Sequence, residues 1–162
     1  MDNDPILVYR ENDNPKLKIT FKELKEFTYA NYDEPLTIEL GNADPFGAMA
    51  FYDEIPKRIL VDKEWWIIKL RKDAYRTKRL ILHELGHFVK KHGNSNKIGR
   101  VQQELEAQLW SIKRAKKLKD KYLIKETIFH FEGWNAKTFK WNSEYRRYIL
   151  ARNKFIKQKM RY

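Results

Sequence analysis

Cysteine is absent from this chain of 162 residues. Its absence excludes disulfide bonds, zinc sites built from thiolates, and cysteine nucleophiles. Any bound metal ion must therefore be held by His, Asp or Glu side chains. Long apolar runs are also absent, because no stretch approaches the roughly 18 residues that span a bilayer. The N-terminus is acidic with a very short apolar core, which is unlike a signal peptide. We therefore expect a cytoplasmic protein without a membrane partner.

The chain also lacks internal repeats, low-complexity tracts and Gly/Ser linkers, which favours one domain over residues 1–162. Strand patterns come first and helical patterns follow, an order typical of an α+β domain with a small N-terminal sheet. Thr20 and Glu23 form a capping-box signature before the first helix. Strands are predicted at 6–10, 36–40, 47–53 and 58–62, and helices at 21–32, 63–70, 73–92, 100–118, 121–131 and 142–160.

The sequence HELGH at residues 83–87 lies inside the helix predicted over 73–92. On a helical wheel, His87 lies about 40° and Glu84 about 100° from His83, so the three side chains share one side. The opposite side carries an apolar set that should anchor the helix. Its members are Ile81, Leu82, Leu85, Phe88 and Val89. Gly86 costs on the order of 1 kcal/mol relative to Ala in mid-helix, which predicts the close approach of another backbone there.

Two imidazoles at i and i+4 can bind one Zn²⁺ ion. Glu84 is offset enough to miss the metal and to act on a water molecule that the metal activates. This chemistry is metal-assisted hydrolysis of an amide, with Glu84 as general base and acid. The alternative is a solvent-facing helix side with two ordinary histidines and a surface carboxylate.

A third ligand must come from outside this helix. Glu104 and Glu106 in the next predicted helix are the candidates, and helical geometry alone does not choose between them. His92 lies near 180° from His83, so a role at the end of the helix suits it better than ligation.

Together, His83, Glu84, His87 and the downstream Glu106 resemble the motif of gluzincin metallopeptidases, in which a later helix supplies a glutamate ligand. The stretch beginning at Glu106, EAQLWS, is similar to a stretch of the ImmA/IrrE-type peptidases, with Trp110 and Ser111 as departures. The similarity covers about residues 36–118, the size of a minigluzincin core. It implies a zincin-like fold, Zn²⁺ as cofactor, Glu106 as the third ligand, and a peptide or protein substrate.

The resemblance also implies that strand 48–53 borders the cleft and pairs with an extended substrate, as in β-augmentation generally. Larger gluzincins stabilise the oxyanion with a Tyr or His from a C-terminal region. Possible counterparts are Tyr122, His130, Tyr145 and Tyr148. No motif distinguishes them, and packing roles are the alternative for each.

The net charge of +12 arises entirely after residue 107, where 16 of the 34 basic residues but only 4 of the 22 acidic ones lie. This region forms a basic helical extension over about 119–162. It predicts either nucleic-acid binding through phosphate contacts or amphipathic helices with solvated basic faces. An alternative function is therefore a nucleic-acid-associated module whose zincin core is vestigial or acts on DNA-bound proteins.

Overall fold

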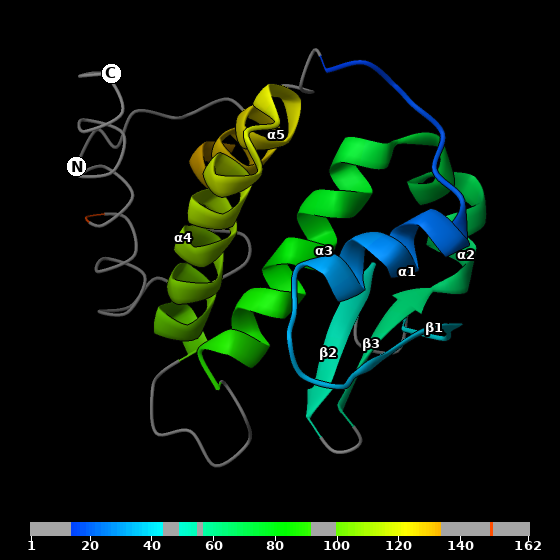
Figure 1. The fold of residues 1–162 in the computed structure, drawn as a ribbon, viewed down its shortest axis with the longest axis horizontal. Coiled ribbons are helices and arrows are strands. Elements are labelled where there is room, and N and C mark those ends of the chain that lie inside the picture. Colours follow the sequence, from blue (N-terminus) through cyan, green and yellow to red (C-terminus); the bar gives the residue numbers. More distant parts are fainter. Residues whose placement is uncertain (1–13, 44–48, 55–56, 92–99, 134–149, 151–162) are drawn as a thin grey trace, which may run out of the picture.

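The structure, a computed structural model, describes residues 14–43, 49–54, 57–91, 100–133 and 150. These residues form five α-helices and a three-stranded sheet, so the predicted α+β class is confirmed (Figure 1). The elements in chain order are α1 (Phe21–Ala30), β1 (Thr37–Gly41), β2 (Ala50–Glu54), β3 (Lys57–Asp62), α2 (Lys63–Ile68), the 3-10 helix η2 (Leu70–Lys72), α3 (Ala74–Val89), α4 (Arg100–Leu118) and α5 (Lys121–Gly133).

The sheet has the strand order β1-β3-β2. Strands β1 and β3 are parallel, with Ile38 opposite Ile59, and β2 and β3 are antiparallel, with Tyr52 opposite Ile59. Within the described residues β2 pairs only with β3, so it lies at an edge of the sheet. Helix α3 packs beside this edge strand. The edge of the sheet therefore borders the helix that carries the HELGH sequence.

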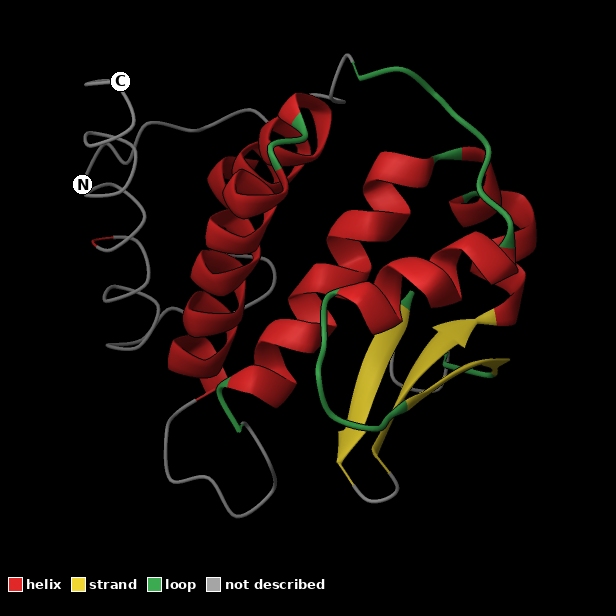
Figure 2. Cartoon of the chain, in the orientation of Figure 1, coloured by secondary structure: helices red, strands yellow, loops and turns green. Residues whose placement is uncertain are grey.

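Helix α3 is the central element, because it contacts α1, β2, α4 and α5 (Figure 2). Its apolar residues Ile81, Leu82 and Leu85 are almost completely inaccessible to solvent. Other side chains of the core come from all the surrounding layers, including Leu24, Ile59, Leu70, Ile112, Leu123 and Phe131. Functional side chains on α3 are thus fixed by packing from several directions.

Helix α1 begins with the capping box expected from the sequence. The Glu23 amide donates to Thr20 Oγ1 at 3.1 Å, and the Thr20 amide donates to Glu23 Oε1 at 3.2 Å. The two side chains satisfy backbone groups that the first turn leaves without helical partners. Leu24 and Thr28 then bury one side of the helix.

Helix α3 ends earlier than predicted. It stops at Val89, where a helix to His92 was expected, and Lys91 takes a left-handed conformation with φ of 56°. Val89 is 40% exposed, so its predicted anchoring role is wrong, whereas Phe88 is buried. Val89, Lys90 and Lys91 are all exposed. The helix ends where it no longer has a packed surface to cover.

The predicted strand at 6–10 falls outside the described residues, and so does the predicted helix at 142–160 apart from residue 150. His92, Tyr145 and Tyr148 fall outside them as well. None of the described helices combines the length and the apolar character needed to cross a membrane.

Candidate metal centre

Helix α3 carries His83 and Glu84 next to each other, and His87 one turn later. The helix begins at Ala74, and the carboxylate of the preceding Asp73 caps it by accepting a hydrogen bond from the Arg76 amide at 3.2 Å. The Nε2 atoms of His83 and His87 are 3.1 Å apart, and the ring planes are nearly perpendicular at 86°. Both imidazoles therefore direct a nitrogen to the same point.

Helix α4 brings a carboxylate to this point. Glu104 Oε2 lies 2.8 Å from His83 Nε2, and Glu104 Oε1 lies 3.4 Å from His87 Nε2. Candidate ligand atoms of the three residues all lie within 4.8 Å of one another. In the described part of the chain, no other trio of His, Cys, Asp or Glu side chains is close enough to hold a metal ion.

The acidic residue beside the histidines is Glu104, whereas the sequence resemblance indicated Glu106. Glu106 Oε1 instead accepts a hydrogen bond from Gln102 Nε2 at 3.4 Å. The reason is the rotation of α4, which turns Ala107 toward α3. Glu104 then lies about 60° from that contact on the helical wheel, and Glu106 about 100° away on the other side. Because Glu104 has the smaller angle from the side of α4 that faces α3, it is the residue that reaches the histidines.

Gly86 marks the contact between the two helices, as the sequence predicted. A Cβ atom built on Gly86 would lie 2.8 Å from the Ala107 carbonyl oxygen and 2.9 Å from the Ala107 Cα. The neighbouring atoms are backbone and cannot rotate away as a side chain would. Glycine therefore allows α4 to approach closely enough for Glu104 to reach His83 and His87.

We expect Gly86→Ala to separate α3 and α4 and to weaken metal binding. Overpacking of this kind costs about 1–3 kcal/mol of unfolding free energy, offset in part by the better helix propensity of Ala, about 1 kcal/mol. Denaturant unfolding and zinc titration of the variant would measure both effects. An unchanged zinc affinity would show that the close contact does not position Glu104.

The charges of His83 and Glu104 depend on each other. Burial lowers the pKa of His83, but the nearby Glu104 carboxylate outweighs this effect and raises it above its usual value. Burial likewise raises the pKa of Glu104, but the charge and hydrogen bond of His83 hold it well below its usual range. Without a metal, the carboxylate is ionised and attracts a positive charge. A bound cation would take the place of the proton on His83.

Glu84 follows His83 on α3, but its carboxyl group is buried and contacts strand β2. Only 7% of Glu84 is accessible, and the Tyr52 backbone amide donates a hydrogen bond to its carboxylate. Burial raises the pKa of Glu84 to about 8, although the His83 charge and the Tyr52 amide act in the opposite direction. A carboxyl group whose pKa lies near neutrality can both accept and return a proton.

Tyr52 on β2 is a site residue that the sequence analysis missed. Its ring stacks on the His87 imidazole, with the ring centres 4.5 Å apart and the planes 14° from parallel. Its backbone also contacts Glu84, so one residue touches two members of the HELGH sequence. A strand pattern indicates that β2 exists, but it gives no sign of which residue faces α3.

The other sequence candidates that can be placed lie on α5. Tyr122 packs against Tyr75, with ring centres 5.3 Å apart, at the opposite end of α3 from His87. His130 lies on the same helix as Glu126, whose carboxylate pairs with buried Arg79 at 3.4 Å. Burial and the Arg79 charge lower the pKa of His130 well below its usual value. His130 is therefore neutral in the folded protein. The charges of His83 and Glu104 also act on its pKa, so His130 lies near the three converging side chains.

Comparisons with protein families, curated proteins and solved structures find no match to this chain. The geometry of the site and the HELGH sequence support the function proposed below.

Proposed function

We propose that this protein is a zinc-dependent peptidase with a zincin-like fold. The observation that carries the proposal is the convergence of His83, His87 and Glu104 next to the buried Glu84. Two imidazoles and one carboxylate are a donor set used by catalytic zinc sites, which keep a further position open. The HELGH sequence on α3, the helix α4 behind it and the edge strand β2 beside it are consistent with the resemblance to gluzincins.

In this proposal, His83 and His87 bind the metal through their Nε2 atoms, and Glu104 binds it through its carboxylate. Zinc in such a site lowers the pKa of a water molecule and polarises a carbonyl group. Glu84 is not among the side chains whose ligand atoms converge, and its carboxylate accepts a hydrogen bond from the Tyr52 amide. It removes a proton from the attacking water and delivers that proton to the leaving amine.

Strand β2 supplies a binding surface for an extended peptide. Its outer edge has no strand partner among the described residues, and its Tyr52 contacts both Glu84 and His87. A peptide that adds to this edge would lie next to the proposed catalytic residue. Backbone pairing accepts many sequences, so we expect the enzyme to cleave unfolded segments with little sequence preference.

Metal removal tests the proposal. We expect about one zinc ion per chain, together with cleavage of an unfolded substrate such as casein. A chelator should remove zinc and abolish cleavage, and added zinc should restore both. Elemental analysis and gel-based proteolysis provide the two measurements.

The variant His83→Ala/His87→Ala separates the possible outcomes. Loss of zinc and of cleavage in this variant is expected, whereas zinc retained by it would refute the assigned ligands. Cleavage that persists without metal would refute the peptidase mechanism. If the wild-type protein binds zinc but cleaves no substrate, the metal site stands and the peptidase activity is refuted.

A further inference from the structure

One end of the domain gathers basic side chains from segments that are far apart in the sequence. We call this surface the basic end. Its members are Lys16, Lys18, Arg71 and Lys72 from the first half of the chain, and Lys116, Lys117, Lys119 and Lys121 from the end of α4, the α4–α5 turn and the start of α5. All eight are exposed. The sequence assigned the basic character to the C-terminal third, but the structure adds four cations from elsewhere.

Specific contacts hold the two groups of cations at the same end. Asn14 Nδ2 donates to the Tyr122 carbonyl at 2.6 Å, and Tyr122 packs against Tyr75 near the start of α3. The Ile19 amide donates to the Arg71 carbonyl at 2.9 Å. The segment before α1 is thus joined to α5 at one side and to η2 at the other. Figure 1 shows this segment leading from the α5 region to α1.

The acidic residues of this region are already engaged in local structure. Asp73 pairs with Lys16 at 2.9 Å and also caps α3. Asp120 accepts hydrogen bonds from the Tyr122 and Leu123 amides at the start of α5. Glu23 is held in the capping box of α1. The three carboxylates keep their negative charge, but the eight cations of the basic end outnumber them.

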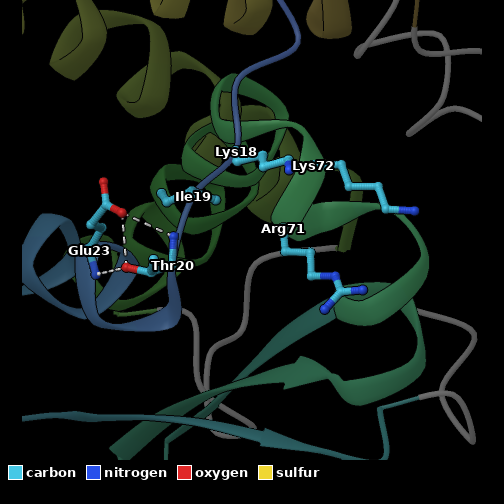
Figure 3. Close-up of a pocket in the computed structure, with 6 residues that line it drawn as sticks. All are labelled: Lys18, Ile19, Thr20, Glu23, Arg71 and Lys72. Atoms are coloured by element: carbon cyan, nitrogen blue, oxygen red, sulfur yellow. Dashed lines mark hydrogen bonds between the residues drawn. The ribbon is translucent and has the colours of Figure 1, made fainter.

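Lys18, Arg71 and Lys72 line a hollow of about 390 Å³ together with Ile19, Thr20 and Glu23 (Figure 3). The charged ends of the three cations point in different directions in Figure 3, and Arg71 Nε donates a hydrogen bond to the Ile67 carbonyl at 3.0 Å. Among the described residues, none of these three cations forms an ion pair. Figure 3 shows Glu23 turned back on Thr20, on the other side of the hollow from Arg71 and Lys72. The first-turn amides of α1 are partly satisfied by this capping. The positive charge of the hollow therefore comes from the side chains of Lys18, Arg71 and Lys72.

We propose that the basic end binds the sugar–phosphate backbone of a nucleic acid, with one phosphate in the hollow of Lys18, Arg71 and Lys72. A single small anion would use only the hollow, whereas the lysines around the α4–α5 turn extend the positive surface beyond it. The phosphates of one strand of a duplex repeat every 3.4 Å or so along the helix axis and can meet such an extended surface. A concave hollow suits a projecting backbone better than it suits a flat bilayer.

The basic end is separate from the proposed peptidase site. Twelve residues of α3 separate Tyr75 from His87, which corresponds to about 18 Å along the helix axis. A nucleic acid at the basic end would therefore leave the metal centre accessible. The two proposals can fail independently, since neither uses a residue of the other.

The test compares two triple variants that lose the same charge. The site variant is Lys18→Gln/Arg71→Gln/Lys72→Gln. The control is Lys25→Gln/Lys63→Gln/Lys90→Gln, three exposed lysines that do not line the hollow. Binding of a labelled duplex of about 20 base pairs is followed by fluorescence anisotropy between about 50 and 200 mM salt. Vesicles containing phosphatidylserine are measured in parallel.

We expect the full chain to bind the duplex with a steep salt dependence. The site variant should lose at least about tenfold in affinity, and its slope of log affinity against log salt should become shallower by about 0.9, since the hollow holds one phosphate and each lost phosphate contact contributes about 0.9. The control should lose less than about threefold, and zinc content should be unchanged in both. Equal losses in both variants, absent duplex binding, or binding to the vesicles alone would each overturn the proposal.

Discussion

Glu104→Gln is expected to abolish stoichiometric zinc binding and, with it, proteolysis. Glutamine keeps the size of the side chain but removes the charge that lies 2.8 Å from His83 Nε2 and 3.4 Å from His87 Nε2. Loss of a residue that only supports a ligand typically costs 10–100-fold in metal affinity. Removal of a charged ligand should cost more, on the order of 1,000-fold or above. Zinc titration against a competing chelator would measure the change.

Glu106→Gln is the matched control for this experiment. It makes the same substitution two residues further along α4, on a side chain that hydrogen-bonds to Gln102. We expect its zinc affinity to remain near that of the wild type, because Glu106 is not among the side chains whose ligand atoms converge. The opposite result, with Glu106→Gln losing zinc and Glu104→Gln retaining it, would identify Glu106 as the third ligand, as the sequence resemblance indicated.

Glu84→Gln is expected to retain zinc and to lose peptide cleavage. General acid–base catalysis contributes about 100- to 10,000-fold to the rate, so kcat should fall by a factor in that range while zinc content remains near that of the wild type. Burial raises the pKa of Glu84 to about 8, so its carboxyl group is largely protonated near neutral pH in the metal-free protein. Glutamine resembles that neutral form in shape and in charge, and the fold should tolerate it.

Circular dichroism and thermal unfolding of metal-free Glu84→Gln provide the control for folding. If the variant folds, binds zinc and still cleaves casein at the wild-type rate, Glu84 is not the general base. If it folds but loses zinc, Glu84 contributes to metal binding, and the assignment of only three ligands is wrong.

The sequence predicted the local structure well, because the signals for it are local. The capping box of Thr20 and Glu23 fixes the start of α1, and the apolar spacing of Ile81, Leu85 and Phe88 fixes the buried side of α3. Gly86 was also interpreted correctly, because a glycine in mid-helix costs stability unless another backbone approaches.

The errors concern how the elements meet. The choice between Glu104 and Glu106 depends on the rotation of α4, which is set by the contact of Ala107 with Gly86 in another helix. Tyr52 reaches the site only because β2 lies at the edge of the sheet beside α3. Val89 satisfies the helical period but lies beyond the packed region. None of these facts is encoded within one segment, so periodicity cannot reveal them.

The pairing of α3 with α4 also has a consequence for how the protein folds. The residues that converge at the candidate metal centre come from two helices that follow each other directly in the chain. Contacts between segments close in sequence cost little loop-closure entropy and tend to form early. Tyr52, by contrast, is 35 residues from His87 in the sequence, whereas Glu104 is only 17 residues from His87. We therefore expect His83, His87 and Glu104 to come together before β2 docks beside α3. The proposed metal centre would then form earlier in folding than the proposed substrate-binding edge.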